Sequence, residues 1–170
     1  TPRFSSKVAL VTGGSRGIGE AIVRRLAAEG AAVAFTYASS ADKAQALVDQ
    51  IESAGGKALA IPAASADVVA SEGAVSATVE RFGALNILVN NAGILLLGSV
   101  DTFSLEDFDR MFAVNVRATF AAAKACSAVM QKGDRIITVG SVVAQRSGFP
   151  GSSVYSMTKS AIAGMIRGLA

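Results

Sequence analysis

The sequence predicts a three-layer α/β fold in which helices cover both faces of a doubly wound parallel sheet. Short apolar segments rich in β-branched residues alternate with longer segments whose apolar residues recur at helical spacing. The short segments are apolar on both sides, which is typical of strands buried in a parallel sheet. A length of 170 residues with 51% hydrophobic residues suits one domain, residues 1–170.

The first half of the chain shows clear signals for the ends of each element. A strand at 7–12 runs into a glycine cluster, and Gly30 stands where a helix often ends in a left-handed residue. Ser40 is expected to cap the next helix, and Gly55 is expected to end it. The elements expected here are strand 7–12, helix 17–29, strand 32–37, helix 40–54 and strand 57–62.

The second half continues the alternation. A long helix over 105–130 is expected to begin at Ser104, with Asp107 three residues further on. The other elements expected here are helix 71–82, strand 87–90, strand 134–140 and a last helix from Ser153. Right-handed crossovers with the first strand at the centre would place a site beyond the carboxyl ends of the strands.

Composition excludes several kinds of site. The chain has no histidine and one cysteine, Cys126, so it cannot build a Ser/His/Asp triad or a Cys/His pair, and no metal site is expected. Proton chemistry must therefore use Tyr, Lys, Asp or Glu. Cys126 is expected to be a small packing residue, and a single cysteine suits the reducing cytoplasm.

Charge and hydropathy favour a small-molecule partner. The net charge is +3, and the basic residues are scattered, which argues against a nucleic-acid partner. The longest strongly apolar stretch, 92–98, is too short to cross a bilayer, and the first eleven residues lack the apolar run of a signal peptide. We therefore expect a cytoplasmic protein without a membrane partner.

A glycine-rich turn, TGGSRGIG at 12–19, joins the first strand to the first helix. Its glycines permit backbone angles and close approaches that a Cβ forbids, and the helix N-terminus offers free N–H groups to a pyrophosphate. This pattern predicts a dinucleotide site, although such turns also serve only to tighten a strand–helix connection. The cofactor-binding residues expected in the turn are Gly13, Ser15, Arg16, Gly17, Ile18 and Gly19.

The end of the second strand bears on cofactor choice. An acidic residue there would bind a ribose 2′-hydroxyl and repel a 2′-phosphate, but this chain has no acid in the segment 36–40. Arg16 lies within plausible reach of the same ribose and forks well onto phosphate. We therefore expect NADP(H) in preference to NAD(H), with Tyr37 and Ser39 beside the ribose. The alternatives are a solvated Arg16 and a Tyr37 that is only a strand aromatic.

Two further motifs follow strand ends. In the segment NNAG at 90–93, the two amides can tie neighbouring loops together, and Ala92 and Gly93 leave room for a flat adenosine beside Asn91. Ser141 follows the fifth strand and could donate a hydrogen bond to a carbonyl oxygen. Each could also be an ordinary turn or loop residue.

Tyr155 and Lys159 stand one helical turn apart and share a helix face. An ammonium beside a phenol stabilises the phenolate and lowers the phenol pKa, which makes a usable acid and base. A surface tyrosine with a solvated lysine is the alternative for this pair taken alone.

Together, these motifs in this order resemble the short-chain dehydrogenase/reductase family over residues 6–170, most closely its 3-oxoacyl-acyl carrier protein reductases and related ketone reductases. The resemblance implies a Rossmann-like fold and hydride transfer between NADP(H) and a small carbonyl or secondary alcohol. It also implies that Tyr155 transfers the proton, Lys159 lowers the Tyr155 pKa and binds the nicotinamide ribose, and Ser141 polarises the carbonyl. Asn115 would hold a water that links Lys159 to solvent, or would simply be satisfied in a helix kink.

The sequence departs from the family pattern in three places. Ala64 stands where an acid usually meets the adenine amino group, unless Ser65 or Asp67 substitutes, and Asn86 replaces a common Asp. The chain is also expected to be truncated at its C-terminus, because family members continue into further strands. The helices 105–130 and 153–170 resemble those through which the family forms homodimers or homotetramers. The alternative function is a non-catalytic dinucleotide-binding or oligomerising fragment.

Overall fold

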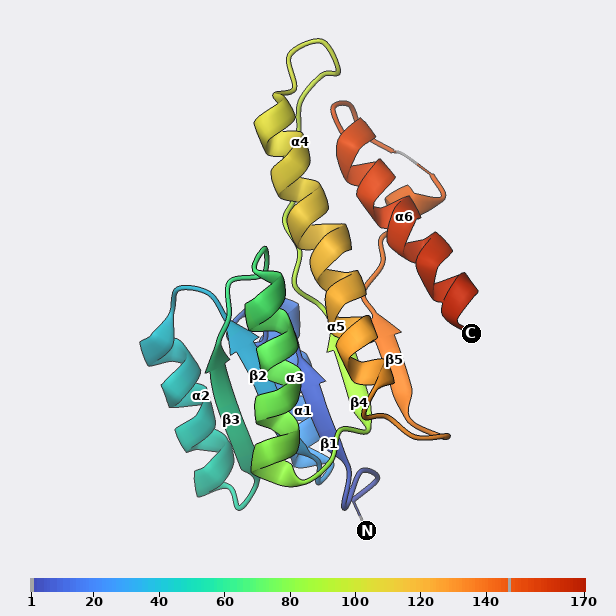
Figure 1. Cartoon of the computed structure of the whole chain (residues 1–170). Coiled ribbons are helices and arrows are strands. Elements are labelled where there is room, and N and C mark those ends of the chain that lie inside the picture. The colour runs from blue at the N-terminus through green and yellow to red at the C-terminus, as the bar shows by residue number, and fades with distance from the viewer. Residues whose placement is uncertain (1, 147) are drawn as a thin grey trace.

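The computed structural model describes residues 2–146 and 148–170, and in it five parallel strands lie between two layers of helices (Figure 1). The strands are β1 (Val8–Val11), β2 (Ala32–Tyr37), β3 (Lys57–Pro62), β4 (Ile87–Asn90) and β5 (Arg135–Thr138). The α-helices are α1 (Gly17–Ala28), α2 (Ala41–Ser53), α3 (Val68–Phe82), α4 (Leu105–Phe112), α5 (Ala118–Ser127) and α6 (Ser153–Leu169). A π-helical segment, Ala113–Arg117, joins α4 to α5, and a 3-10 turn, Val142–Ala144, follows β5.

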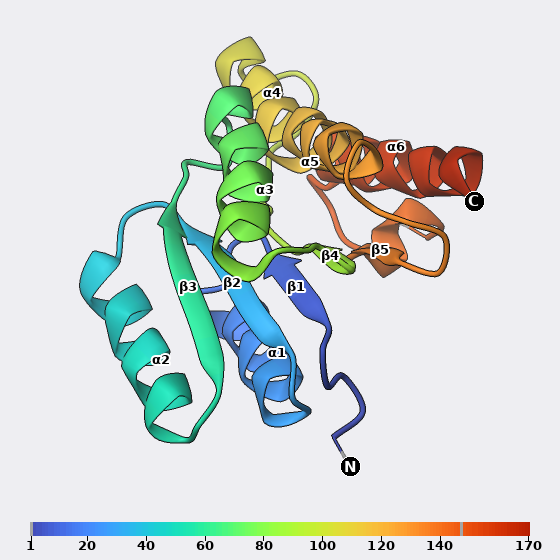
Figure 2. The ribbon, with the colours of Figure 1, turned by 60° about the horizontal axis from the view of Figure 1, so that its bottom comes forward.

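The sheet has the order β3-β2-β1-β4-β5, with all neighbours parallel. This confirms the doubly wound fold with the first strand at its centre. The chain moves outward from β1 in one direction through β2 and β3, and then in the other through β4 and β5 (Figure 2). The direction reverses between β1 and β4, so a crevice opens beyond their carboxyl ends.

Each face of the sheet has its own apolar core. On one face, Phe35 of β2 packs with Val23 of α1 and Leu47 of α2. On the other, Leu88 of β4 packs with Val75 of α3 and with residues of α5. Burial on both faces explains why β1, β2 and β4 read as continuous apolar runs, whereas alternate residues of β5 are exposed, contrary to the expectation that all strands are buried on both sides.

The expected single helix over 105–130 is divided into three parts. Ser104 begins it as predicted, with its Oγ accepting a hydrogen bond from the Asp107 N–H at 3.0 Å. The π-helical segment then interrupts α-helical geometry, and the helix ends at Ser127, before Met130. The wider turn places the side chain of Asn115 in the interior, where it is 1% exposed.

Two other helix starts differ from the expectation. Helix α3 begins at Val68, three residues before the expected start, because Asp67 caps it by accepting from the Ala70 N–H at 3.0 Å. Ser40 precedes α2 as expected but makes no side-chain capping bond. Gly30 and Gly55 end their helices as predicted, with φ of +93° and +82°.

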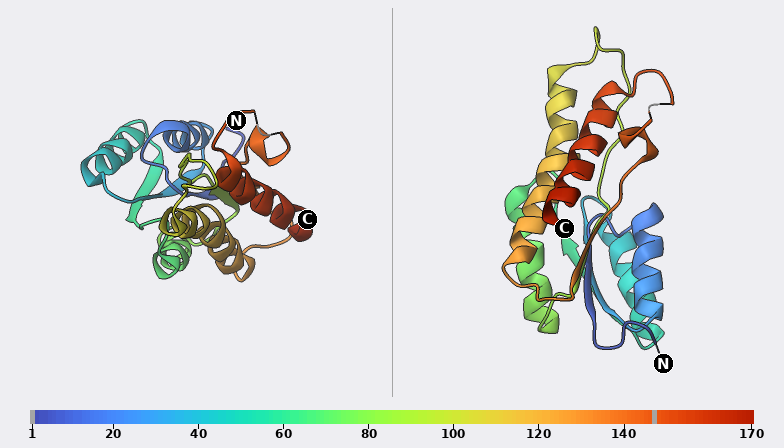
Figure 3. Two further views of the ribbon diagram at one scale, coloured as in Figure 1. Left: turned by 90° about the horizontal axis from the view of Figure 1, so that it is seen from above. Right: turned by 90° about the vertical axis from the view of Figure 1, so that its right-hand side faces the viewer.

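Helices α4 and α6 extend beyond the carboxyl edge of the sheet, side by side (Figures 1 and 3). The inner face of α6 buries Val154 and Ile162, whereas Leu169, at the end of the same helix, is 57% exposed. None of the helices in the described ranges has the length and apolar character needed to cross a membrane.

Candidate active site

The glycine turn after β1 is shaped by close approaches. Gly13 and Gly17 have φ of +67° and +57°, the left-handed region that glycine adopts at little cost. A Cβ on Gly19 would overlap the carbonyl oxygen of Gly13, so helix α1 can lie against this turn only with glycine there. The turn thus has the cradle geometry that a pyrophosphate at the start of α1 requires.

Asn91 ties the glycine turn to the end of β4. Its Nδ2 donates to the carbonyl oxygens of Thr12 at 3.0 Å and Gly13 at 3.1 Å. The Thr12 hydroxyl oxygen in turn accepts from the Asn91 and Ala92 N–H groups at 3.0 and 3.1 Å. The amide therefore joins two neighbouring loops, as the sequence indicated, and holds the crevice edge in a fixed shape.

Lys159 reaches into the protein from α6, so the solvated-lysine alternative is wrong. The residue is 6% exposed, and its Nζ donates to the carbonyl oxygen of Val139 at 3.0 Å. The same Nζ lies 5.8 Å from the centre of the Tyr155 ring. Burial lowers the pKa of Lys159, because the interior solvates the ammonium less well than water does.

Asn115 and Gly93 lie close to each other and to Lys159. A Cβ on Gly93 would lie 3.4 Å from Asn115 Oδ1 and 3.8 Å from Lys159 Nζ. Asn115 Oδ1 accepts from the Ile94 N–H at 2.8 Å, and its Nδ2 donates to the Ile94 carbonyl at 2.9 Å. The side chain thus fastens the loop after NNAG to the π-helical segment, which fits a polar residue satisfied in a helix kink.

Thr158 is a site residue that the sequence analysis did not single out. It is fully buried, and its Oγ1 accepts from Asn115 Nδ2 at 3.1 Å while donating to the Tyr155 carbonyl at 2.8 Å. It thereby connects the π-helical segment to the turn of α6 that carries Tyr155 and Lys159. In the sequence, Thr158 could have been found only from its position directly before Lys159.

Ser141 stands at the expected place, between β5 and the 3-10 turn. It is partly buried, and its Oγ accepts from the Val143 N–H in a long 3.4 Å contact. The turn that follows packs on α6, where Ser160 Oγ donates to the Ala144 carbonyl at 3.1 Å. The structure therefore brings the Ser141 segment against the helix of Tyr155.

The residues expected at the adenosine end lie at the carboxyl ends of β1 and β2. Arg16 is exposed immediately before α1, and Tyr37 is half-buried at the end of β2. Ser15 is half-buried, whereas Ile18 and Ser39 are exposed. Of the two substitutes considered for an acid at Ala64, Asp67 uses its Oδ1 to cap α3, and Ser65 makes no side-chain hydrogen bond to any residue that the structure describes.

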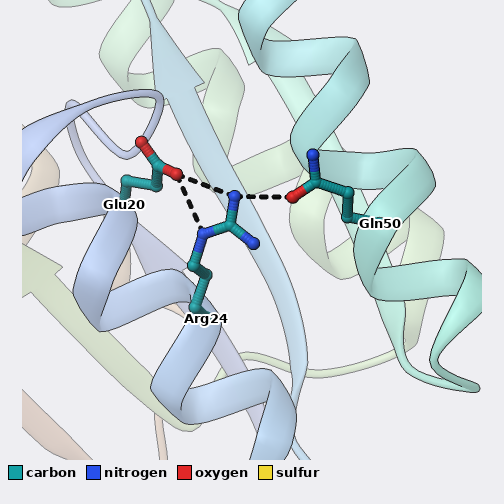
Figure 4. A network of polar contacts seen from close by, with 3 residues as sticks. All are labelled: Glu20, Arg24 and Gln50. Carbon is teal, nitrogen blue, oxygen red and sulfur yellow. Dashed lines mark hydrogen bonds and ion pairs between the residues drawn. The ribbon is translucent and has the colours of Figure 1, made fainter.

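A separate cleft of about 690 Å³ lies at the opposite, amino end of β1, β2 and β3. At its edge, Arg24 of α1 donates to Glu20 Oε1 at 2.9 Å and to Gln50 Oε1 of α2 at 2.6 Å (Figure 4). None of the predicted site residues lines this cleft, and its exposed polar network links two helices at little net gain in stability. The candidate active site is therefore the crevice at the carboxyl end.

A family model described as short chain dehydrogenase matches residues 7–170. Together with the Rossmann-like sheet and the crevice at its carboxyl edge, this places the chain in the short-chain dehydrogenase/reductase family, a class of oxidoreductases. The sequence resemblance and the fold class are thereby confirmed.

Named relatives show the same similarity. The chain is 42% identical over 170 residues to elsinochrome reductase 1 of Elsinoe fawcettii, covering 100% of this chain and 64% of that relative. A short-chain dehydrogenase/reductase from Serratia marcescens is 54% identical with a TM-score of 0.97, covering 100% of this chain and 69% of the other. A short chain dehydrogenase from Burkholderia cenocepacia, solved in complex with NADP, is 51% identical with a TM-score of 0.96, covering 98% and 68%. The chain thus spans about two thirds of the length of these proteins.

Proposed function

We propose that this chain carries the nucleotide-binding and proton-transfer groups of an NADP(H)-dependent reductase of ketones or 3-oxoacyl groups. The observation that carries the proposal is the buried Lys159 ammonium, 5.8 Å from the ring centre of Tyr155. In this proposal, the buried ammonium lies near the negative charge that forms when Tyr155 gives up its proton to the carbonyl oxygen.

Each polar group has a role in this proposal. Tyr155 gives a proton to the carbonyl oxygen in reduction and takes it back from the alcohol in oxidation. Ser141 donates a hydrogen bond that orients the carbonyl, and Lys159 supplies the positive charge. Asn115 keeps the loop after NNAG in place and lies beside a water path from Lys159. NADPH, when bound, supplies the hydride that the carbonyl carbon receives.

The glycine cradle supports a dinucleotide as the cofactor, since Gly13, Gly17 and Gly19 leave the start of α1 open to a pyrophosphate. Preference for NADP(H) over NAD(H) rests on Arg16, which is exposed beside the turn and has no acidic residue near it at the end of β2. The similar Burkholderia protein was solved in complex with NADP. If NADH were used far better than NADPH, the argument from Arg16 would be overturned.

Turnover of NADPH with a β-keto ester tests the function. We expect Tyr155→Phe to lose at least about 100-fold in kcat, because proton transfer contributes that much or more, while NADPH affinity stays within about twofold. Lys124→Gln, a change on the exposed side of α5, is the matched control and should keep full activity. Full activity in Tyr155→Phe would refute the assigned acid.

A nucleotide-binding chain without turnover is the second candidate. Its support is the outer side of β5: the described residues place no strand beside it, and Ile137 is 52% exposed. Binding of NADPH without its oxidation by any ketone tested would favour this second function.

We also propose that the chain self-associates as a dimer or tetramer, because apolar residues on α5 and α6, such as Phe120 and Leu169, are exposed. Light scattering during size-exclusion chromatography would measure the mass of the assembly.

A further inference from the structure

A small cavity lies under the adenosine end of the crevice, between the carboxyl edge of the sheet and the start of α5. Its volume is about 20 Å³, enough for one water molecule. Polar side chains make up much of its wall, including Thr12, Thr36, Ser65 and Asn90. The lining is mixed, but it includes hydroxyl and amide groups that can bond a water, which a cavity lined by aliphatic side chains alone lacks.

One acceptor in this wall is unsatisfied. Asn90 is 4% exposed, and its Nδ2 donates to Thr138 Oγ1 at 3.3 Å, but its Oδ1 is buried with no hydrogen-bond partner. Buried polar atoms in folded proteins are nearly always paired, with protein or with ordered water. An unpaired amide oxygen beside a water-sized polar cavity points to a bound ligand that donates a hydrogen bond.

Two other side chains in the cavity wall can still form hydrogen bonds. Thr36 Oγ1 accepts from the Gly13 N–H at 2.9 Å, and within the described residues its own hydroxyl proton has no acceptor. Ser65 makes no side-chain hydrogen bond within the same residues, although it is half-buried. By contrast, the Ser71 hydroxyl, in the same wall, already donates its proton to the carbonyl oxygen of Asp67 at 2.8 Å.

We propose that Asn90 and Thr36 hold one water in this cavity, and that this water and the Ser65 hydroxyl bind the amino group of adenine. This rests on the proposed nucleotide site. The carboxylate expected for that task is absent at Ala64, and Ser65 is its immediate neighbour in the chain. Ala92, whose small side chain leaves room for adenosine, lines the same cavity. Asn90 is a positioning residue, since it acts through the water.

Deamino-NADPH, in which hypoxanthine replaces adenine, tests the inference because it lacks the amino group. Fluorescence titration should show that the protein binds NADPH about three- to tenfold more tightly than deamino-NADPH, the range expected for one hydrogen bond. Asn90→Leu should reduce this ratio to below about twofold by weakening NADPH alone. Lys124→Gln, whose exposed side chain does not line the cavity, is the control and should keep the full ratio.

The outcomes separate the two proposals. Equal affinity of the unchanged protein for both nucleotides overturns the inference and leaves the proposed function intact. Failure to bind NADPH at all overturns the proposed function. If Asn90→Leu does not fold, Ser65→Ala gives the second test: it should also lower the ratio, and an unchanged ratio overturns the role given to Ser65. A crystal structure without nucleotide should show the water within hydrogen-bond distance of Asn90 Oδ1, and an empty cavity there overturns the inference.

Discussion

Lys159 keeps its ammonium inside the fold, with the Val139 carbonyl as acceptor, and burial lowers its pKa. At pH values between the lowered pKa of Lys159 in the folded chain and its value near 10.5 in the unfolded chain, the unfolded chain binds more protons. The free energy of unfolding that this residue contributes therefore rises as pH rises through that window. The same enclosed charge that suits Tyr155 thus weakens the fold at neutral pH.

Replacing Lys159 with an apolar residue should raise the free energy of unfolding at neutral pH. We compare the free energy of unfolding of Lys159→Met with that of the unchanged protein. The variant's advantage should be largest near neutral pH and should fall steadily as pH approaches 10.5. Urea unfolding at several pH values measures this difference. Lys124→Met, at an exposed position, should show no such trend, and a flat difference for Lys159→Met would contradict the buried-charge argument.

Two glycines give opposite expectations for the same substitution. In Gly19→Ala, the new methyl would overlap the Gly13 carbonyl and lie 2.5 Å from Asn91 Nδ2, so we expect a loss of about 1–3 kcal/mol. In Gly73→Ala, within α3, the methyl meets no atom within 4 Å, so we expect a gain of about 0.5–1 kcal/mol. Urea unfolding of both variants, with NADPH titration of each, is the measurement. Similar stability for the two would show that the turn yields more easily than its contacts indicate.

At the scale of elements, Asn86 links the starts of three strands. Its Oδ1 accepts from the Val8 N–H at 3.0 Å, and its Nδ2 donates to Asp134 Oδ1 at 3.0 Å, just before β5. Hydrogen bonds from the Gln131 N–H and from Asn86 hold the pKa of Asp134 below its usual value. The amide serves both neighbours because it has an acceptor on one side and a donor on the other.

Asn86→Asp keeps the acceptor for Val8 but sets a carboxylate against Asp134. We expect the variant to lose up to about 1 kcal/mol at neutral pH, with the loss shrinking as pH falls below about 4 and the carboxyls become protonated. Thermal or urea unfolding against pH measures this. A loss that stays constant with pH would point to packing and not to charge.

The sequence predicted the strands well and the helices less evenly. All five strands were placed within two residues of their ends, because short apolar runs bounded by turn residues stand out between longer helical segments. The interruption at Ala113–Arg117 was missed, since one extra residue barely alters an apolar periodicity. The early start of α3 was missed because the capping role of Asp67 was not recognised, although Val68, Val69 and Ala70 make the first turn apolar.

For the site, residue types were predicted but most of their partners were not. Tyr155 and Lys159 lie together on α6, and the glycine turn joins β1 to α1, as their spacing predicted, while the roles given to these residues and to Asn115 stay predictions. Two hydrogen bonds depend on how α6 packs against the sheet. Lys159 donates to the Val139 carbonyl, and Asn115 donates to the Thr158 hydroxyl. Such contacts are set by tertiary packing between distant segments, which no local pattern encodes.

At the scale of the whole molecule, Cys126 reports on global unfolding. It is fully buried between α5 and the sheet, and burial raises the pKa of its thiol to about 12. Because the thiolate is the reactive form, we expect iodoacetamide to modify Cys126 only in unfolded molecules. Mass spectrometry across a urea series should therefore give the same midpoint as circular dichroism. Rapid labelling in the absence of urea would mean that α5 opens locally.

The π-helical segment also fixes the position of Asn115 between α4 and α5. A π-helical turn holds one residue more than an α-helical turn, so deleting one residue from 113–117 would let α4 and α5 join as a regular α-helix with their faces nearly unchanged. The Asn115 amide would then leave the Ile94 loop. We therefore expect such a deletion to spare the packing of α5 and to damage the crevice.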